Sequence, residues 1–448
     1  MPKKILLVQS YLGRSEPVTF PIALATLAAR INDKYELSGF DPNVYAAPEE
    51  ELQAQIHHYL PDVIAVSLRN IDTTNLINPH IHYNGFLRTL EVVKEASKDL
   101  SLVVGGAGFS LYAERIMHDN PVIDYGIYLE GENTFAELLE KMNAPESVKG
   151  VYYRQNGKIH FTGRREPAPI DDTSFPLWEI FDVEKYKNYP FPFGVETKRG
   201  CPFECVYCSY FLLHGKTIRL RRPERVVEEI VELRRRFGTK QVCFLDSVFN
   251  VPVDHAVTIL QLMRREVPDV AWLGYLSERG LTAQFARLAV ETGLRVFVFS
   301  ADSYTDECLQ LMGKGITVEQ IHQAVEVVRN TPPLHIGLNF FVNGPGYTYG
   351  TLAALLWFLI KTKIKLGRRF NFMKLNLGYI RIEPGTPIHR LALQSGHLTP
   401  DVDLLPLEPK GYKRCFFYNR NLWLFNALFS LLSKGLRKLR GVHPCSGV

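Results

Sequence analysis

Three cysteines stand close together in the segment "VETKRGCPFECVYCSY", at Cys201, Cys205 and Cys208. Clustered thiolates bind zinc or iron–sulfur clusters in proteins. A structural zinc usually takes four protein ligands, and this segment supplies one compact group of three. A four-iron cluster held by three thiolates would keep one iron open for a substrate or cofactor. The spacing therefore favours an open iron–sulfur site, with a zinc completed by His214 as the alternative.

The other cysteines do not share this spacing. The chain holds seven cysteines, an odd number spread over 448 residues, which excludes a secreted disulfide framework. Cys243 lies in an apolar stretch and is expected in the core, since a free cysteine packs as a small hydrophobe. Cys308, Cys415 and Cys445 are isolated, so we expect no second iron–sulfur site.

Composition limits the class of protein that carries this site. The chain is 46% hydrophobic and 22% charged, as folded globular proteins are, and its length predicts two or three domains. A net charge of +5 is mild for this length and gives no strong nucleic-acid signature. With no apolar run of the roughly 18 residues that a bilayer requires and no signal peptide, we expect a cytoplasmic protein.

The first part of the chain, residues 1–145, alternates apolar strands with helices of ten to fifteen residues. This alternation predicts an α/β domain with a doubly wound, mostly parallel sheet. Ligands of such sheets bind at the carboxyl ends of the strands. The residues that follow three of the predicted strands are Arg69 and Asn70, Gly105 and Gly106, and Glu130 and Gly131.

Residues 146–190 are rich in proline and are predicted to form a linker that includes a hairpin with Asn156 and Gly157 at its turn. Residues 191–395 contain six further β/α units, which predict a partial (β/α)6 barrel of the TIM type. The cysteine segment follows the first strand of this barrel, where such folds place their chemistry. Residues 396–448 are predicted to form a small helical extension.

The barrel region resembles the radical S-adenosylmethionine (SAM) enzymes. The motif C-x-x-x-C-x-x-C, with Tyr207 just before Cys208, is the signature of that superfamily, and the resemblance extends over residues 190–395. It implies a [4Fe-4S] cluster whose open iron is chelated by the amino and carboxylate groups of SAM. Electron transfer from the cluster would then cleave a carbon–sulfur bond and give a 5′-deoxyadenosyl radical. The SAM-binding residues implied are Tyr207, Asp246, Ser277, Asp302, Gly344 and Pro345.

Two positions depart from the usual pattern of this family. Asp302 precedes Ser303 at the fourth barrel strand, where a glutamate is usual, and Tyr347 stands after Gly346, where a glutamate commonly follows the Pro-Gly pair. For Asp246, at the end of the second strand, contact with a ligand and structural capping are equally open. The third strand ends in Tyr275, Ser277 and Glu278, for which the same two interpretations hold.

The N-terminal region is similar to the cobalamin-binding domain that precedes many radical SAM barrels. The segments "TFPIALATLAARI", "VVGGAGFS" and "DYGIYLEGENTFAELLE" carry this resemblance in order. The first strand is followed by "QSYLGRSEP", so the histidine that ligates cobalt in some corrinoid domains is absent from that loop. Arg69 would lie beneath a corrin, where its cation cannot ligate cobalt. Alternatively, Arg69 pairs with an acidic residue at the sheet edge.

The C-terminal segment "NRNLWLFNALFSLLSKGLRKLRG" has apolar residues at helical spacing and ends in four cations. Such a helix can lie on a membrane or bind a lipid-like substrate, and it can equally cap the barrel. Capping is the expectation.

These resemblances predict a cobalamin-dependent radical SAM methyltransferase that acts on an unreactive carbon or phosphorus centre of a small molecule or peptide. Its expected partner is an external reductant of the flavodoxin or ferredoxin type, with no nucleic acid. One alternative is a radical SAM enzyme that performs cyclisation, rearrangement or 3-amino-3-carboxypropyl transfer, with the corrin as a relay or absent. The other is a non-enzymatic iron–sulfur or zinc protein, which the length of the resemblance disfavours.

Overall fold

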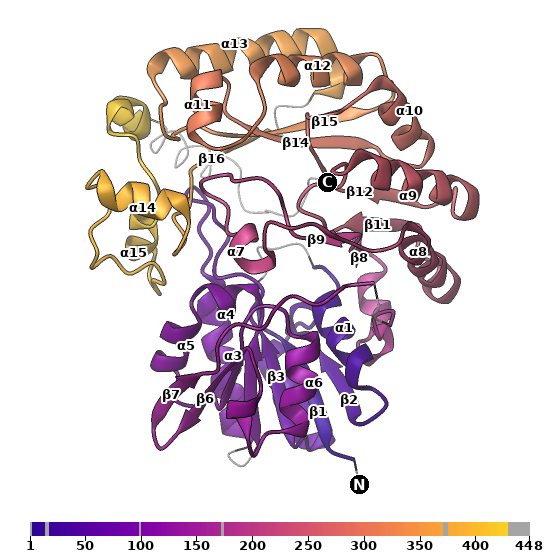
Figure 1. Ribbon diagram of the computed structural model, residues 1–448, viewed down its shortest axis with the longest axis vertical. Coiled ribbons are helices and arrows are strands. Elements are labelled where there is room, and N and C mark those ends of the chain that lie inside the picture. Colours follow the sequence, from indigo (N-terminus) through magenta and orange to yellow (C-terminus); the bar gives the residue numbers. More distant parts are fainter. Residues whose placement is uncertain (1, 14–17, 98–99, 172–173, 371–374, 429–448) are drawn as a thin grey trace. The chain divides into compact units, whose positions relative to one another are not determined.

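The computed structural model describes residues 2–13, 18–97, 100–171, 174–370 and 375–428. The chain forms two compact units, which are best described separately. The first unit holds Met1–Thr73, Pro79–Tyr189 and Leu405–Pro409, and the second holds Thr74–Asn78, Pro190–Leu404 and Lys410–Val448. Figure 1 labels most of their helices and strands.

The first unit is built on a seven-stranded sheet with the order β2-β1-β3-β4-β5-β6-β7. Strands β1 to β5 pair in parallel, and β6 and β7 extend the sheet in antiparallel fashion. The strands are β1 (Lys4–Gln9), β2 (Glu36–Phe40), β3 (Val63–Ser67), β4 (Ser101–Gly105), β5 (Tyr125–Ile127), β6 (Val151–Gln155) and β7 (Lys158–Phe161). Every residue of β3 is buried, as expected of a central strand covered on both faces.

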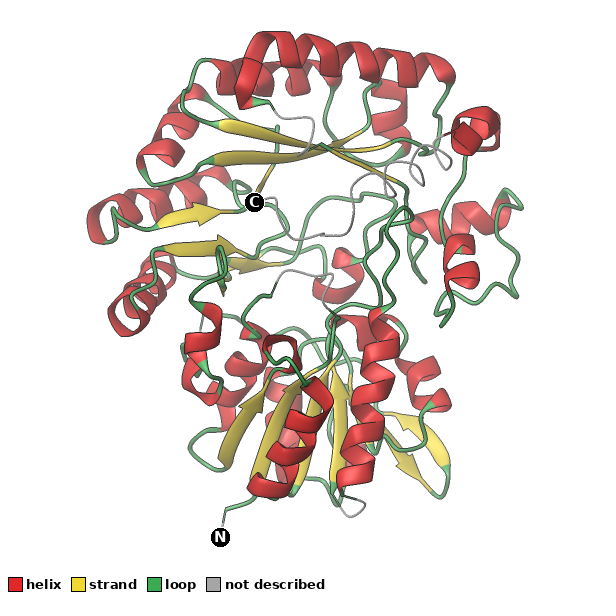
Figure 2. Cartoon of the chain, turned by 180° about the vertical axis from the view of Figure 1, so that it is seen from behind, coloured by secondary structure: helices red, strands yellow, loops and turns green. Residues whose placement is uncertain are grey.

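The helices of the first unit cover both faces of this sheet, as the two opposite views show (Figure 1 and Figure 2). Helix α1 packs against α6, and α2 packs against α3. The helices are α1 (Ile22–Ile31), α2 (Pro48–Tyr59), α3 (His82–Ala96), α4 (Ala107–Leu111), α5 (Ala113–Asp119) and α6 (Glu132–Glu140). The predicted doubly wound domain is confirmed.

The predicted hairpin is present between β6 and β7. Asn156 and Gly157 both have positive φ, of 51° and 74°, as a two-residue turn between twisted strands requires. Because β6 pairs with β5, the hairpin belongs to the sheet of the first unit, whereas the sequence suggested a linker over residues 146–190.

The second unit contains two parallel sheets, with the orders β12-β11-β8 and β13-β14-β15-β16. Strands β12 and β13 are two halves of one predicted strand, interrupted at Gly274, so six strand positions follow one another as in a partial barrel (Figure 1). The strands are β8 (Phe193–Val195), β11 (Gln241–Phe244), β12 (Ala271–Leu273), β13 (Tyr275–Leu276), β14 (Val296–Asp302), β15 (His335–Phe341) and β16 (Asn376–Gly378).

Successive helices of the second unit pack against one another outside these strands, in the series α8, α9, α10, α12 and α13. The helices are α7 (Tyr210–His214), α8 (Pro223–Phe237), α9 (Val253–Glu266), α10 (Ala283–Glu291), α11 (Asp306–Leu311), α12 (Val318–Arg329), α13 (Tyr349–Leu366), α14 (Pro387–Gln394) and α15 (Pro409–Arg414). The predicted β/α order of this region is confirmed.

The predicted C-terminal helix is only partly within the described residues. Residues 423–428 are helical, and the remainder of the predicted segment, 429–441, lies outside the described part of the chain. Within the described ranges, no helix is long and apolar enough to cross a membrane.

A close backbone approach in the first unit explains one of the predicted glycines. Gly106 has a φ of 102° and a ψ of 170°, a conformation open almost only to glycine. A β-carbon at this position would lie 2.5 Å from the carbonyl oxygen of Leu68, at the end of β3. The glycine therefore lets the turn after β4 lie against the chain that leaves β3.

We predict that Gly106→Ala lowers the free energy of unfolding by about 2 to 4 kcal/mol, because alanine would be strained in this conformation and would overlap the backbone. Chemical denaturation of the purified protein would measure the change. Gly157→Ala is the matched control, since its φ is also positive but its added β-carbon meets nothing within 4 Å, so it should cost about 1 kcal/mol. Equal effects of the two substitutions would contradict the role assigned to Leu68.

Candidate active site

The cysteine loop follows a short strand, β9 (Lys198–Arg199), which pairs in antiparallel fashion with β10 (Arg219–Leu220). Gly200 has a φ of 90°, and a β-carbon there would lie 2.1 Å from the carbonyl oxygen of Thr217, so the two sides of the loop touch at their base. The amide of Cys201 donates to the carbonyl of Gly215 at 3.1 Å, and the amide of Cys208 donates to that of Cys205 at 3.0 Å. These contacts gather the three cysteines within one small loop.

The middle of this loop is fixed by two other elements. The amide of Val206 donates to the carbonyl of Met312 at 3.0 Å, and its carbonyl accepts from the amide of Ile388 at 2.9 Å. The backbone of Gly313, which has a φ of 63°, lies against the backbone of Glu204 in the loop. A β-carbon at Gly313 would lie 2.4 Å from the carbonyl oxygen of Glu204. The loop is therefore held by the end of α11 and the start of α14.

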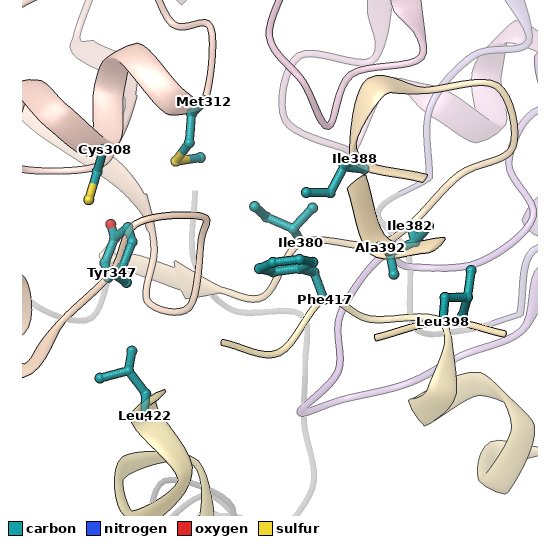
Figure 3. Packing of buried hydrophobic residues seen from close by; sticks show 10 residues of the cluster. All are labelled: Cys308, Met312, Tyr347, Ile380, Ile382, Ile388, Ala392, Leu398, Phe417 and Leu422. Atoms are coloured by element: carbon teal, nitrogen blue, oxygen red, sulfur yellow. The ribbon is translucent and has the colours of Figure 1, made fainter. Parts of the chain in front are cut away.

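Met312 and Ile388 also belong to a cluster of buried apolar residues (Figure 3). Val206 and Tyr207 of the cysteine loop pack against it. Its buried members are Cys308, Met312, Tyr347, Ile380, Ile382, Ile388, Ala392, Leu398, Phe417 and Leu422. The cluster contains residues of α11, of α14 and of the C-terminal segment. The predicted extension, residues 396–448, therefore contributes to the apolar surface on which the cysteine loop packs.

The three thiols differ in exposure and in their surroundings. Cys201 and Cys205 are buried and Cys208 is partly exposed. Burial raises the pKa of the Cys205 thiol and raises that of Cys208 to about 12, and the neighbouring cysteines add to both effects. The charge of Lys314 opposes these shifts. Binding of iron to these thiols would therefore release protons.

These residues fit an iron–sulfur cluster by their donor chemistry. Three thiolates from one loop are the ligand set that such clusters take, and the amide of Tyr210 points to the sulfur of Cys208 at 3.4 Å. In the described part of the chain, no group of three or more His, Cys, Asp or Glu side chains is arranged to hold a single metal ion. His214, the fourth ligand of the zinc alternative, packs on the ring of Tyr210.

A charged network joins the cysteine loop to the end of β14. Asp302, at a bulge in β14 with a φ of 65°, accepts hydrogen bonds from Lys314 Nζ at 2.5 Å and from the hydroxyl of Tyr207. Lys314 Nζ also lies 3.5 Å from the Tyr207 hydroxyl. Burial would lower the pKa of Lys314, but Asp302, Cys205 and Glu278 together raise it, so the side chain stays charged.

Glu278 is a buried carboxyl at the edge of this network. Burial raises its pKa to about 7, and the charge of Lys314 partly opposes the shift. Among the described residues, its Oε1 has no hydrogen-bond partner. For Glu278 the sequence left ligand contact and structural capping equally open, and Lys314 was not predicted as a site residue, although both lie beside predicted site residues.

The carboxylate of Asp246, another predicted SAM-binding residue, binds neighbouring residues of the protein. Its carboxylate accepts from the amide and the hydroxyl of Thr197, at 2.9 and 2.5 Å, and from Lys198 Nζ at 3.3 Å. Lys198 also donates to the carbonyl of Phe249 at 2.7 Å. This buried pair fixes the segment between β8 and β9, just before the cysteines, and a contact of Asp246 with SAM stays a prediction.

The remaining predicted residues of the second unit lie at strand ends. The amide of Ser277 donates to Asn250 at 2.7 Å, and its hydroxyl accepts from the amide of Arg279 at 3.1 Å. Gly344 and Pro345 are buried in the turn after β15. The hydroxyl of Tyr347 lies 2.5 Å from the carbonyl of Phe341 and 3.2 Å from that of Asp302, so this turn is joined to the network around Lys314.

The predicted cobalamin-binding residues of the first unit lie at or just after the ends of β3, β4 and β5, which are parallel neighbours and end at the same edge of the sheet. Arg69 Nη1 donates to the hydroxyl of Thr19 at 2.7 Å. Burial raises the pKa of Asp41, and the charge of Arg69 is among the opposing influences. The residues at this edge are Arg69, Asn70, Gly105, Gly106, Glu130 and Gly131, and their contacts with a corrin stay predictions.

We predict that Glu278 makes stability depend on pH. Its folded pKa of about 7 exceeds the ordinary value of 4.5, so the folded state holds the proton more tightly. The resulting stabilisation is complete below pH 4.5 and is lost as the pH rises through about 7, with a total of about 3 kcal/mol. Denaturant unfolding at several pH values should show this slope in the parent protein and a flatter profile in Glu278→Gln. Parallel profiles would contradict the assignment.

Comparison with known families supports both units. The B12 binding domain matches residues 9–139, and the Radical SAM superfamily matches residues 195–359. An uncharacterized methyltransferase of Pyrococcus horikoshii, PH0819, is 28% identical over 352 residues, which cover 77% of this chain and 74% of that protein. The cytidylyl-2-hydroxyethylphosphonate methyltransferase of Streptomyces wedmorensis is 23% identical over 67% of this chain and 61% of its own length.

A third relative has a different named activity. The anaerobic magnesium-protoporphyrin IX monomethyl ester cyclase of Rubrivivax gelatinosus is 24% identical over 302 residues, which cover 63% of this chain. The chain spans 51% of the length of that cyclase, and so about half of it.

Among solved structures, the radical SAM methyltransferase TsrM of Kitasatospora setae, with tryptophan and a SAM analog bound, aligns with a TM-score of 0.78. The alignment covers 97% of this chain and 89% of TsrM at 18% identity, so it shows a shared fold. The two matched domains and the shared fold agree with one another. The chain is a radical S-adenosylmethionine enzyme with a cobalamin-binding domain, and over most of its length it is similar to cobalamin-dependent methyltransferases.

Proposed function

We propose that this enzyme transfers a methyl group from SAM to an unreactive carbon or phosphorus centre of a small-molecule or peptide substrate, in the cytoplasm. The observation that carries this proposal is the presence, in one chain, of a three-cysteine loop on a radical SAM barrel and a preceding B12 binding domain. The cytoplasm is reducing, which keeps such thiols available for a cluster.

Cys201, Cys205 and Cys208 would hold the cluster, and the edge formed by the ends of β3, β4 and β5 would hold the corrin. When bound, the cluster, SAM and cobalamin supply one-electron reduction and methyl donation. The chain itself positions these groups. The cysteine loop packs on the apolar cluster of Figure 3. The Lys314–Asp302 pair binds the hydroxyl of Tyr207, which lies between Cys205 and Cys208 in the sequence.

Three side chains would contribute a charge or a proton to this function. Lys314 places a permanent cation near the thiols, which would favour the anionic cluster that they hold. Arg69 places a cation at the predicted lower face of the corrin, where it offers no lone pair to cobalt. Glu278, with a pKa of about 7, can hold or release a proton near neutral pH at the same end of the barrel as Lys314.

A second candidate function is a cyclisation without methyl transfer, which the similarity to the Rubrivivax cyclase favours. An external reductant of the flavodoxin or ferredoxin type would serve either reaction. The identity of the substrate decides between the two, and the comparison proteins act on chemically different compounds.

We predict that Cys205→Ala abolishes the cluster while leaving the second unit folded. Anaerobic reconstitution of the parent protein should give about four irons per chain and a brown colour, and the variant should lose most of both. Cys243→Ala is the matched control, because Cys243 is a half-buried cysteine on β11 outside the loop. Equal iron in both variants, or one zinc in a colourless parent, would contradict the cluster assignment.

Product analysis tests the methyl transfer itself. With reductant and hydroxocobalamin, the reconstituted enzyme should retain a corrin through gel filtration, and turnover should convert SAM to S-adenosylhomocysteine. Methyl-labelled SAM should pass its label to the corrin fraction, or to a substrate where one is supplied. Formation of 5′-deoxyadenosine without S-adenosylhomocysteine would exclude the methyl-transfer proposal and favour the second candidate function.

A further inference from the structure

Helix α13 has an apolar outward face. Its inward side packs into the second unit through buried residues such as Leu355, Phe358 and Leu359. Its opposite side exposes four large apolar residues at helical spacing, so they share one face. These residues, which we call the α13 face, are Leu356 (59% exposed), Trp357 (57%), Ile360 (38%) and Ile364 (76%).

Cations accompany this face, and acids are absent from the segment. Residues 349–370 contain five lysines and arginines and no aspartate or glutamate. Lys361 lies over the ring of Trp357 at 5.0 Å, and Lys365, one turn further along, pairs with Glu326 of α12 at 2.6 Å. A side chain such as Lys361 can cover apolar surface with its stem and hold its charge in a polar layer.

A second acid-free segment begins beside the start of α13. The side-chain amide of Asn419 donates to the carbonyl of Tyr347 at 2.8 Å, two residues before the helix. The segment that follows exposes Trp423, Leu424 and Leu428, while Leu422 on the same segment is buried in the apolar cluster. Residues 409–448 carry a formal charge of +8, which exceeds the +5 of the whole chain.

We propose that the α13 face docks on the surface of an anionic lipid bilayer. Exposed aliphatic side chains with a tryptophan suit the boundary between acyl chains and headgroups, and the accompanying cations suit anionic lipids. This proposal does not depend on methyl transfer.

Charge distinguishes a bilayer from the other possible occupants. In a two-fold dimer through this face, the cations of one copy would approach those of the other, which is unfavourable. A nucleic acid would match the cations but would leave the exposed leucine and isoleucine side chains without an apolar partner. Only a surface that is both apolar and anionic satisfies both features.

The test uses the full-length protein and sedimentation with vesicles. One set contains phosphatidylcholine alone, and in the other about a third of the lipid is phosphatidylglycerol. We expect binding to the anionic vesicles that weakens in about 0.5 M salt, and about tenfold weaker partitioning for Trp357→Gln/Ile364→Gln. Because both side chains are exposed, iron content and circular dichroism should match the parent.

Leu60→Gln/Val122→Gln is the matched control, since it removes two exposed apolar side chains from the first unit and should bind as the parent does. Lys361→Gln/Arg368→Gln should lose the preference for anionic vesicles. The proposal is overturned if the parent does not bind anionic vesicles, or if the Trp357 and Ile364 variant binds them as strongly as the parent. It is also overturned if light scattering without lipid shows a dimer that this variant converts to a monomer.

Discussion

The buried ion pair between Lys314 and Asp302 is the interaction on which the active site depends. It joins the end of β14, the segment after α11 and, through Tyr207, the cysteine loop. The ammonium and the carboxylate are both largely buried, so neither has water to replace its partner. Removing one partner of such a pair typically costs about 3 to 5 kcal/mol, because the other remains charged and unpaired. The pair therefore couples the position of the loop to the ends of the barrel strands.

Hydrogen bonds and apolar packing both stabilise the position of the cysteine loop. The amide of Val206 donates to the carbonyl of Met312 and its carbonyl accepts from the amide of Ile388, while Val206 and Tyr207 pack against the apolar cluster. The Asp246–Lys198 pair fixes the strand that leads into the loop, with both side chains almost fully buried. A rigid loop suits a cluster, since the thiolates then keep their positions whether or not the open iron carries a ligand.

The sequence predicted the parts of this site that depend on local spacing. The three cysteines, the order of strands and helices, and the turn at Asn156 and Gly157 all leave patterns within a few residues. It did not predict that Lys314 would reach Asp302 or that Asp246 would bind Thr197 and Lys198, because those contacts depend on how separate strands meet. The sequence pattern also predicted a single strand where the structure has β8 and β9. The segment is divided because β8 pairs with β11 and β9 pairs with β10, and the hydrophobic pattern does not indicate these pairings.

The exposure of helix α13 is another feature that the sequence pattern alone does not predict. Its first twelve residues, 349–360, are all uncharged, and a helix that is apolar around its whole circumference is expected to be buried. In the structure α12, the preceding helix of the series, contacts α13, while Leu356, Trp357 and Ile364 stay more than half exposed among the described residues. Excess apolarity on an outer helix carries a cost in solubility, which lysines along its edge offset in water. At a lipid surface the same residues would be favourable, so the composition of α13 is explained by two environments and not by the fold alone.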